Sequence, residues 1–102
     1  MDYGLTRNAI DSLNDIFSHY GQIQEVILYG SRAIGNFREG SDIDLTLLGD
    51  NLDTALVHKI SNDIDNRMLP WLFDISVFSQ IQNPDLIDHI NHVGIRIYVK
   101  KE

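Results

Sequence analysis

The stretch VILYGSRAIGNFREGSDIDLTLL, residues 26–48, joins two short apolar segments through a polar segment that contains three glycines. β-Branched and aromatic side chains dominate residues 25–29, which predicts a strand that Gly30 ends. Residues 31–35 are expected to form a short helix. Apolar and polar side chains then alternate over residues 42–48, and this period of two predicts a second strand.

Cap residues and apolar spacing place the remaining elements outward from this stretch. Helices are expected from Thr6 to Gly21, from Asp53 to Pro70 and from Asn83 to Gly94, and strands from Phe73 to Phe78 and from Ile95 to Val99. The buried stripe expected for the second of these helices includes Met68. This order of elements predicts a sheet of about four strands with helices packed mainly on one face.

Length and composition bound the class of protein. A chain of 102 residues, 43% of them hydrophobic, fits one domain over residues 1–102. The absence of cysteine excludes disulfides and thiolate metal sites. The sequence shows neither a signal-peptide pattern nor an apolar run of roughly 18 residues, so we expect a cytoplasmic protein without a membrane segment.

The charge balance of the chain is acidic. Eight Lys and Arg residues against fifteen Asp and Glu give a net charge of -7, and the basic residues are scattered apart from Lys100 and Lys101. Such a surface repels nucleic-acid backbones, so no direct nucleic-acid binding is expected. It suits a divalent cation together with a protein or small-molecule acceptor.

Gly30 and Ser31 have the features of a phosphate-binding turn. Glycine permits a tight turn and a close approach of the backbone to a ligand. The N–H groups at the start of the following helix favour an anion, and the Ser31 hydroxyl adds a donor. The segment is too short for a P-loop, and a Gly-Ser pair on its own is more often an ordinary turn.

Three aspartates are candidate metal ligands. Asp42 and Asp44 lie two residues apart on a predicted strand, so their side chains share one face about 7 Å apart. Like charges at this spacing raise each other's pKa and favour a hard cation such as Mg²⁺. Asp74 joins them if its strand is a neighbour, which is the arrangement for a two-metal attack on phosphorus. A lone Asp-x-Asp is more often a solvated strand edge, but here Gly-Ser lies ten residues upstream.

At these residues the chain resembles the minimal nucleotidyltransferases, a branch of the DNA polymerase beta-like superfamily. The family pattern is Gly-Ser, a short spacer, Asp-x-Asp, and a third acid on a later strand. The resemblance is carried by Gly30, Ser31, Ala33, Gly35, the run Ser41–Leu45, Asp74 and the closing segment Ile90–Tyr98. It implies an α+β fold in two layers, with a mixed sheet of about four strands backed by helices.

The resemblance also implies a reaction and residue roles. Gly30 and Ser31 would bind the β- and γ-phosphates of a nucleoside triphosphate, expected to be ATP. Asp42, Asp44 and Asp74 would be the catalytic residues and would hold two Mg²⁺ ions, with Asp74 helping to deprotonate an acceptor hydroxyl. That hydroxyl would attack the α-phosphorus and expel pyrophosphate, leaving AMP on the acceptor.

One position departs from the family pattern. Relatives often carry a basic residue where this chain has Ile34, which removes one phosphate contact. Arg32 or Arg38 is the candidate replacement, and Arg32 is counted here among the nucleotide-binding residues. Each of these arginines, taken alone, is more often a solvated surface residue.

Small members of the family are often encoded beside a HEPN-domain protein as a toxin–antitoxin pair. By this resemblance the chain is expected to be an antitoxin that adenylylates its HEPN toxin partner within a hetero-oligomer. Two alternatives stay open: a catalytically weak module that masks its partner, and transfer to an antibiotic or another small molecule. The intact Asp42–Asp44 pair argues against the first, and the lack of an additional acceptor-binding domain argues against the second.

Other polar and aromatic residues are assigned no function from the sequence. His89 and His92 lie three residues apart on a predicted helix, a spacing that can bind a metal, but no third ligand is evident. We therefore expect both to be helix-surface histidines. Trp71 is expected to be a core or rim aromatic.

Overall fold

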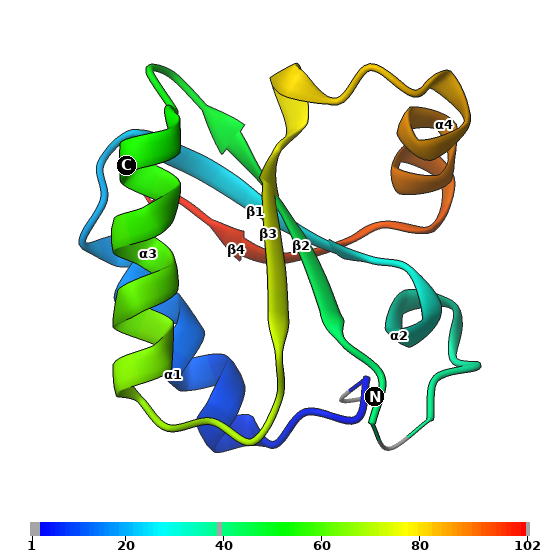
Figure 1. The fold of residues 1–102 in the computed structure, drawn as a ribbon, viewed down its shortest axis with the longest axis horizontal. Helices are drawn as coiled ribbons and strands as arrows, with labels where there is room; N and C mark the ends of the chain where they lie inside the picture. Colours follow the sequence, from blue (N-terminus) through cyan, green and yellow to red (C-terminus); the bar gives the residue numbers. More distant parts are fainter. Residues whose placement is uncertain (1–2, 39, 102) are drawn as a thin grey trace.

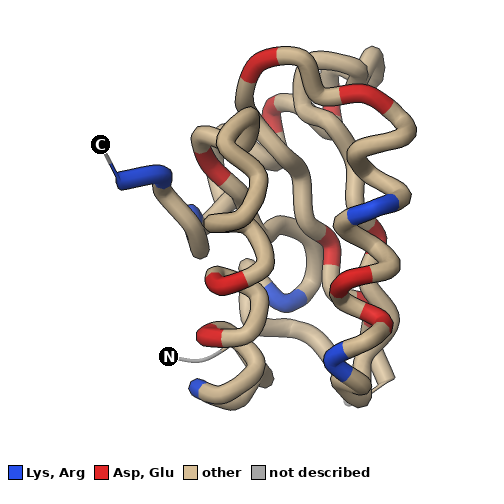
Figure 2. Tube along the Cα trace, turned by 90° about the vertical axis from the view of Figure 1, so that its left-hand side faces the viewer, with Lys and Arg blue, Asp and Glu red and all other residues tan. Residues whose placement is uncertain are grey.

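The computed structural model describes residues 3–38 and 40–101, and its elements follow the predicted order (Figure 1). The elements are α1 (Arg7–Ser18), β1 (Ile23–Tyr29), α2 (Ser31–Ile34), β2 (Ile43–Gly49), α3 (Thr54–Asn66), β3 (Phe73–Val77), a 3-10 turn η1 (Phe78–Gln80), α4 (Pro84–Val93) and β4 (Ile95–Val99). Among the described residues, none of the helices could span a bilayer. Figure 2 shows acidic residues spread along the trace, with fewer basic ones among them.

The three predicted helix caps are confirmed. The Thr6 hydroxyl accepts the N–H of Ala9 at 3.1 Å, and the Asp53 carboxylate accepts the N–H of Leu56 at 2.8 Å. Asn83 caps α4 in the same way, with proline at the first helical position. Each cap satisfies a backbone donor that the first helical turn leaves without a partner, which fixes where these helices begin.

The four strands form one mixed sheet in the order β3-β2-β1-β4. β1 pairs antiparallel with both β2 and β4, whereas β2 and β3 are parallel and are connected through α3. The α+β class and the four-stranded mixed sheet are therefore confirmed. The register places Tyr29 opposite Asp44, and Asp44 opposite Asp74 on the other side.

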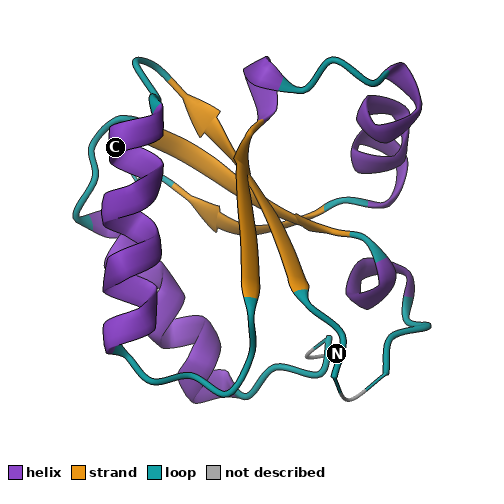
Figure 3. Cartoon of the chain, viewed as in Figure 1, coloured by secondary structure: helices purple, strands orange, loops and turns teal. Residues whose placement is uncertain are grey.

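The two faces of the sheet differ in what covers them. In Figure 3 the two long helices α1 and α3 lie to the left of the sheet, and α2 and α4 lie to the right. The helices that back the sheet most extensively are thus on one face, as expected, while α2 and α4 occupy the other side. Fully buried strand side chains in the core that includes α1 and α3 are Ile23, Val26, Leu28, Ile43, Leu45 and Leu47.

A hydrogen bond links the segment just after α1 to α3 on this packed face. The Tyr20 hydroxyl donates to the carboxylate of Asp63. This bond raises the pKa of Tyr20 to about 12, because ionisation of the phenol would remove the donor and place two negative charges together. The bond connects two segments that are 43 residues apart in the chain.

The end of α3 differs from the expectation. The helix stops at Asn66, and Met68, which was expected in the buried stripe, is 88% exposed. Met68 has a φ of 56°, in the left-handed region that does not continue an α-helix. The helix therefore ends four residues before Pro70, where its end was expected. Phe78, expected at the end of the strand, begins the 3-10 turn instead.

Candidate active site

The predicted site residues meet at one end of the sheet, where β1 ends and the parallel strands β2 and β3 begin. Asp44 is the second residue of β2, and Asp74 is the second residue of β3. The two are direct partners in the β2–β3 register. Alternation along the strands directs both carboxylates away from the face covered by α1 and α3.

Gly30 brings the backbone directly against one of these carboxylates. Its φ of 79° and ψ of -156° belong to a region that side chains other than glycine rarely adopt. A Cβ built on Gly30 would lie 2.4 Å from Asp44 Oδ2, so any larger residue at this position would require the Asp44 side chain to shift. The Gly30 carbonyl accepts the N–H groups of Ala33 and Ile34 at 3.1 and 3.3 Å, which closes the turn into α2.

Ser31 follows this turn as the first residue of α2 and is half-buried. Its carbonyl accepts the N–H groups of Gly35 and Asn36 at 3.0 and 3.1 Å. These bonds fix the backbone of the short helix α2, of which Ser31 is the first residue. Gly30 and Ser31 are therefore adjacent to the β2 end that carries Asp44.

The three aspartates are placed unequally. Asp44 is half-buried, whereas Asp42 and Asp74 are exposed. Burial raises the pKa of Asp44, the negative charges of Asp74 and Asp42 raise it further, and His89 partly offsets them. Within residues 3–38 and 40–101, no three His, Cys, Asp or Glu side chains are gathered as a preformed metal cage.

Arg32 is part of the interior, which the expectation of a solvated surface arginine did not foresee. Its side chain is 2% exposed. Nε and Nη2 donate to the Ser41 carbonyl at 3.2 and 2.8 Å, Nη1 donates to the Tyr3 carbonyl at 3.1 Å, and the guanidinium lies 4.8 Å from the centre of the Phe37 ring. The arginine thus holds the backbone immediately before Asp42, and each of its three guanidinium nitrogens donates to a main-chain carbonyl.

His89 lies at this site, and the prediction that it is an ordinary helix-surface histidine is wrong. The N–H of Gly30 donates to His89 Nε2 at 2.9 Å. The ring also meets the edge of Tyr29, with centroids 6.2 Å apart and planes at 77°. His89 and Gly30 are 59 residues apart, so no local pattern in the sequence indicates this contact. His92 instead donates from Nδ1 to the Asp88 carbonyl of its own helix at 2.7 Å.

Tyr29 is the last residue of β1 and lies opposite Asp44 in the sheet. It is 8% exposed, and burial raises the pKa of its hydroxyl. The charges of Asp44 and Asp74 raise that pKa further, and a hydrogen bond with Ser76 lowers it. Polar side chains on this face of the sheet therefore interact with one another from Tyr29 on β1 to Asp74 and Ser76 on β3.

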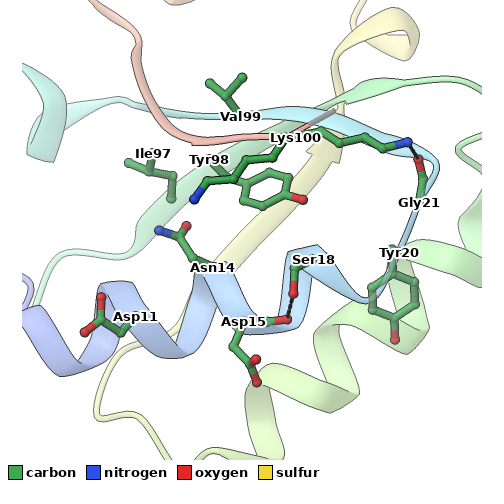
Figure 4. Close-up of a pocket in the computed structure, with 11 residues that line it drawn as sticks. Asp11, Asn14, Asp15, Ser18, Tyr20, Gly21, Ile97, Tyr98, Val99 and Lys100 are labelled. Atoms are coloured by element: carbon green, nitrogen blue, oxygen red, sulfur yellow. Dashed lines mark hydrogen bonds between the residues drawn. The ribbon is translucent and has the colours of Figure 1, made fainter.

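A cavity elsewhere in the molecule does not contain these residues. It has a volume of about 570 Å³ and lies between α1 and β4 (Figure 4). Its lining includes Gly21, which precedes β1, and Lys100, whose Nζ donates to the Gly21 carbonyl at 3.0 Å. The cavity is therefore at the opposite end of β1 from Gly30.

Comparison with known proteins decides the family. The family described as polymerase beta, nucleotidyltransferase, matches residues 11–102. The chain belongs to this family. The nucleotidyltransferase is also 32% identical over 85 residues to a protein of Methanocaldococcus jannaschii that is named, provisionally, a protein adenylyltransferase. That match covers 67% of this chain and 85% of the relative.

Solved structures share the fold of this nucleotidyltransferase. A chain of a toxin–antitoxin complex with AMP-PNP superposes with a TM-score of 0.71 at 19% identity, covering 95% of this chain and 76% of that one. A chain of the Shewanella oneidensis complex between a tri-AMPylated HEPN toxin and an MNT antitoxin gives 0.68 at 13% identity, covering 94% and 74%. The predicted minimal nucleotidyltransferase fold is confirmed, and the chain is an enzyme of the nucleotidyltransferase class.

Proposed function

We propose that this nucleotidyltransferase moves AMP from ATP to a hydroxyl group of a HEPN-domain toxin and thereby acts as its antitoxin. The observation that carries the proposal is the juxtaposition of Asp44, Asp74 and the Gly30 turn at one end of the sheet. The provisional adenylyltransferase name of the archaeal relative and the toxin–antitoxin complexes among the similar folds support the choice of acceptor. Such a pair would act in the cytoplasm.

The phosphates would bind at the Gly30-Ser31 turn. Gly30 has no side chain, so a phosphate can approach the backbone closely, and Ser31 supplies a hydroxyl donor. The guanidinium of Arg32 takes no direct part in this proposal, because it is buried on the carbonyls of Ser41 and Tyr3. Arg32 instead would hold the loop that leads to Asp42.

Asp42, Asp44 and Asp74 would hold two Mg²⁺ ions. Three carboxylates are a donor set that suits a hard divalent cation, and one of them, Asp44, is half-buried with its pKa raised by burial and by the charges of the other two. Exposed Asp42 and Asp74 side chains have the freedom to turn toward an ion beside Asp44. When bound, Mg²⁺ would neutralise charge that develops on the phosphate oxygens.

The reaction would exchange one phosphate bond for another. The acceptor oxygen attacks the α-phosphorus and forms a new P–O bond, while the bond from the α-phosphorus to the bridging oxygen breaks and pyrophosphate leaves. The acceptor hydroxyl gives its proton to the carboxylate of Asp74, which is exposed at the edge strand β3. The exposed position gives a protein-borne hydroxyl access to this base.

The metal and nucleotide part of the proposal is tested by calorimetry with ATP in the presence and absence of Mg²⁺. The wild-type protein is expected to bind ATP in a Mg²⁺-dependent manner, and the double variant Asp42→Asn, Asp44→Asn is expected to lose that dependence because it removes two anionic ligands. Asp65→Asn, which changes an exposed acid on α3, is the matched control and should bind like wild type. Unchanged binding by the folded double variant would contradict the metal assignment.

The transfer step is tested with a candidate HEPN-domain partner protein, purified and incubated with this nucleotidyltransferase, ATP and Mg²⁺. Mass spectrometry should show the addition of AMP with wild-type protein and none with Asp74→Asn. Two findings would overturn the proposal. Neutralisation of the toxin by the double aspartate variant would identify a masking module, and transfer to a small hydroxylated compound but not to the protein would identify a different acceptor.

A further inference from the structure

We propose that His89 is a positioning residue that sets the orientation of the Gly30 peptide and thus the geometry of the nucleotide-binding turn. The inference rests on the proposed function only for the identity of the ligand, ATP. Its structural basis is the hydrogen bond from the Gly30 N–H to His89 Nε2, 2.9 Å long, between the end of β1 and helix α4.

Gly30 is a position at which the backbone benefits from an external restraint. Glycine loses more conformational freedom than any other residue when it is held in one conformation. Here it adopts a φ of 79° directly against the carboxylate of Asp44. A hydrogen bond to the Gly30 N–H fixes the peptide that joins Tyr29 to Gly30, and so determines the direction in which Ser31 and the first turn of α2 are presented.

The His89 ring is itself held in place. Its edge-to-face contact with Tyr29, at 6.2 Å and 77°, comes from the residue immediately before Gly30. The neighbouring residue on α4, Ile90, is 1% exposed and anchors the helix. The bond to Gly30 also requires Nε2 to be an acceptor, which places the ring proton on Nδ1 in this geometry.

The hydrogen bond to His89 determines which N–H groups can face a phosphate. Because the Gly30 N–H points to His89, it is not one of the donors offered to a nucleotide in this conformation. The phosphate donors would therefore come from Ser31, because the N–H groups from Ala33 to Asn36 donate to the carbonyls of Gly30 and Ser31. His89 acts through Gly30 and is not a catalytic residue.

Three variants separate positioning from a general structural role. His89→Leu removes the acceptor, and His89→Gln keeps an amide oxygen that can accept the same hydrogen bond. His92→Leu changes a histidine on the same helix whose ring bonds to the Asp88 carbonyl and not to the turn. Thermal unfolding establishes that each variant is folded before its nucleotide binding is compared.

Calorimetry with ATP and Mg²⁺ should give a dissociation constant about tenfold weaker for His89→Leu, the effect of one lost hydrogen bond in a positioned site. His89→Gln should recover most of the affinity, and His92→Leu should bind like wild type. Wild-type affinity in a folded His89→Leu variant, or equal losses in the Leu and Gln variants, would overturn the proposal.

A measurement without nucleotide keeps this inference separate from the proposed function. Nitrogen-15 NMR of the wild-type protein should show the Nδ1–H tautomer of His89, and the Gly30 amide proton should shift in His89→Leu but not in His92→Leu. Detection of an Nε2–H tautomer would overturn the positioning role even if ATP binds. If the NMR result holds but wild-type protein does not bind ATP, the proposed function fails and the contact between His89 and Gly30 stands.

Discussion

The two faces of β2 carry side chains of opposite character, apolar on one face and polar or charged on the other. Leu45 and Leu47 are fully buried against the side covered by α1 and α3, whereas Asp44 and Thr46 point to the other side. Thr46 Oγ1 accepts a hydrogen bond from Ser76 Oγ at 3.0 Å, but Asp44 has like charges as neighbours. Apolar burial on one face stabilises the folded protein, whereas repulsion between the carboxylates on the other face destabilises it.

The difference indicates that the packed face stabilises a site that is unfavourable by itself. The backbone that carries Asp44 is fixed because the residues on either side of it, Ile43 and Leu45, are both buried in the core. The carboxylate of Asp44 can therefore be kept in place although its pKa is raised by burial and by the charges of Asp74 and Asp42, which His89 offsets only in part. This interpretation predicts effects of opposite sign for substitutions on the two faces.

The largest effect is expected on the packed face. Leu45→Ala should lower the free energy of unfolding by about 3 kcal/mol, because it leaves a cavity in a site that is 0% exposed. Urea denaturation measures the change. Leu72→Ala, at a position that is 76% exposed, is the matched control and should cost much less. Equal costs for the two leucines would contradict the assignment of the core.

An intermediate effect is expected where the interior meets the polar face. Arg32→Gln should destabilise the protein by about 2 kcal/mol, since it removes charge-assisted hydrogen bonds to the Ser41 and Tyr3 carbonyls. It should also weaken Mg²⁺-dependent ATP binding, because the loop before Asp42 loses its anchor. Lys59→Gln, which removes an exposed positive charge on α3, provides the control for both measurements. A change in ATP binding without any loss of stability would instead favour a direct phosphate contact by Arg32.

The smallest effect is expected on the charged face, and its sign is reversed. Asp44→Asn should raise the stability of the protein without Mg²⁺ at pH 7 by about 0.5 kcal/mol, a value reduced for solvent screening. The folded protein holds the Asp44 proton to a higher pH than the unfolded chain does, so the wild type loses stability as the pH rises through that interval. The advantage of the Asn variant should therefore disappear in acid.

Thermal unfolding from pH 3 to pH 8 measures this dependence. Asp50→Asn, an exposed acid after β2, controls for the change in net charge. An Asn variant that is less stable than wild type at pH 7 would show that Asp44 makes a stabilising contact. In that case the contrast between the two faces of β2 would not hold.

Local chemistry in the sequence determined most of the elements and the main site. Thr6, Asp53 and Asn83 cap helices because each satisfies backbone donors within three residues of itself. Alternation over β2 separates the core side chains from the acidic ones in the same local way. The Gly-Ser and Asp-x-Asp pattern also sufficed to predict the family.

Tertiary structure alone decided how distant residues complete that site. His89 reaches Gly30 from 59 residues away, and Arg32 is buried on the carbonyls of Tyr3 and Ser41. Such contacts depend on the order of strands and on where α2 and α4 lie, and neither can be deduced from residues near them in the chain. The placement of Asp74 beside Asp44 has the same origin, because the parallel pairing of β2 and β3 exists only once α3 has crossed the packed face of the sheet.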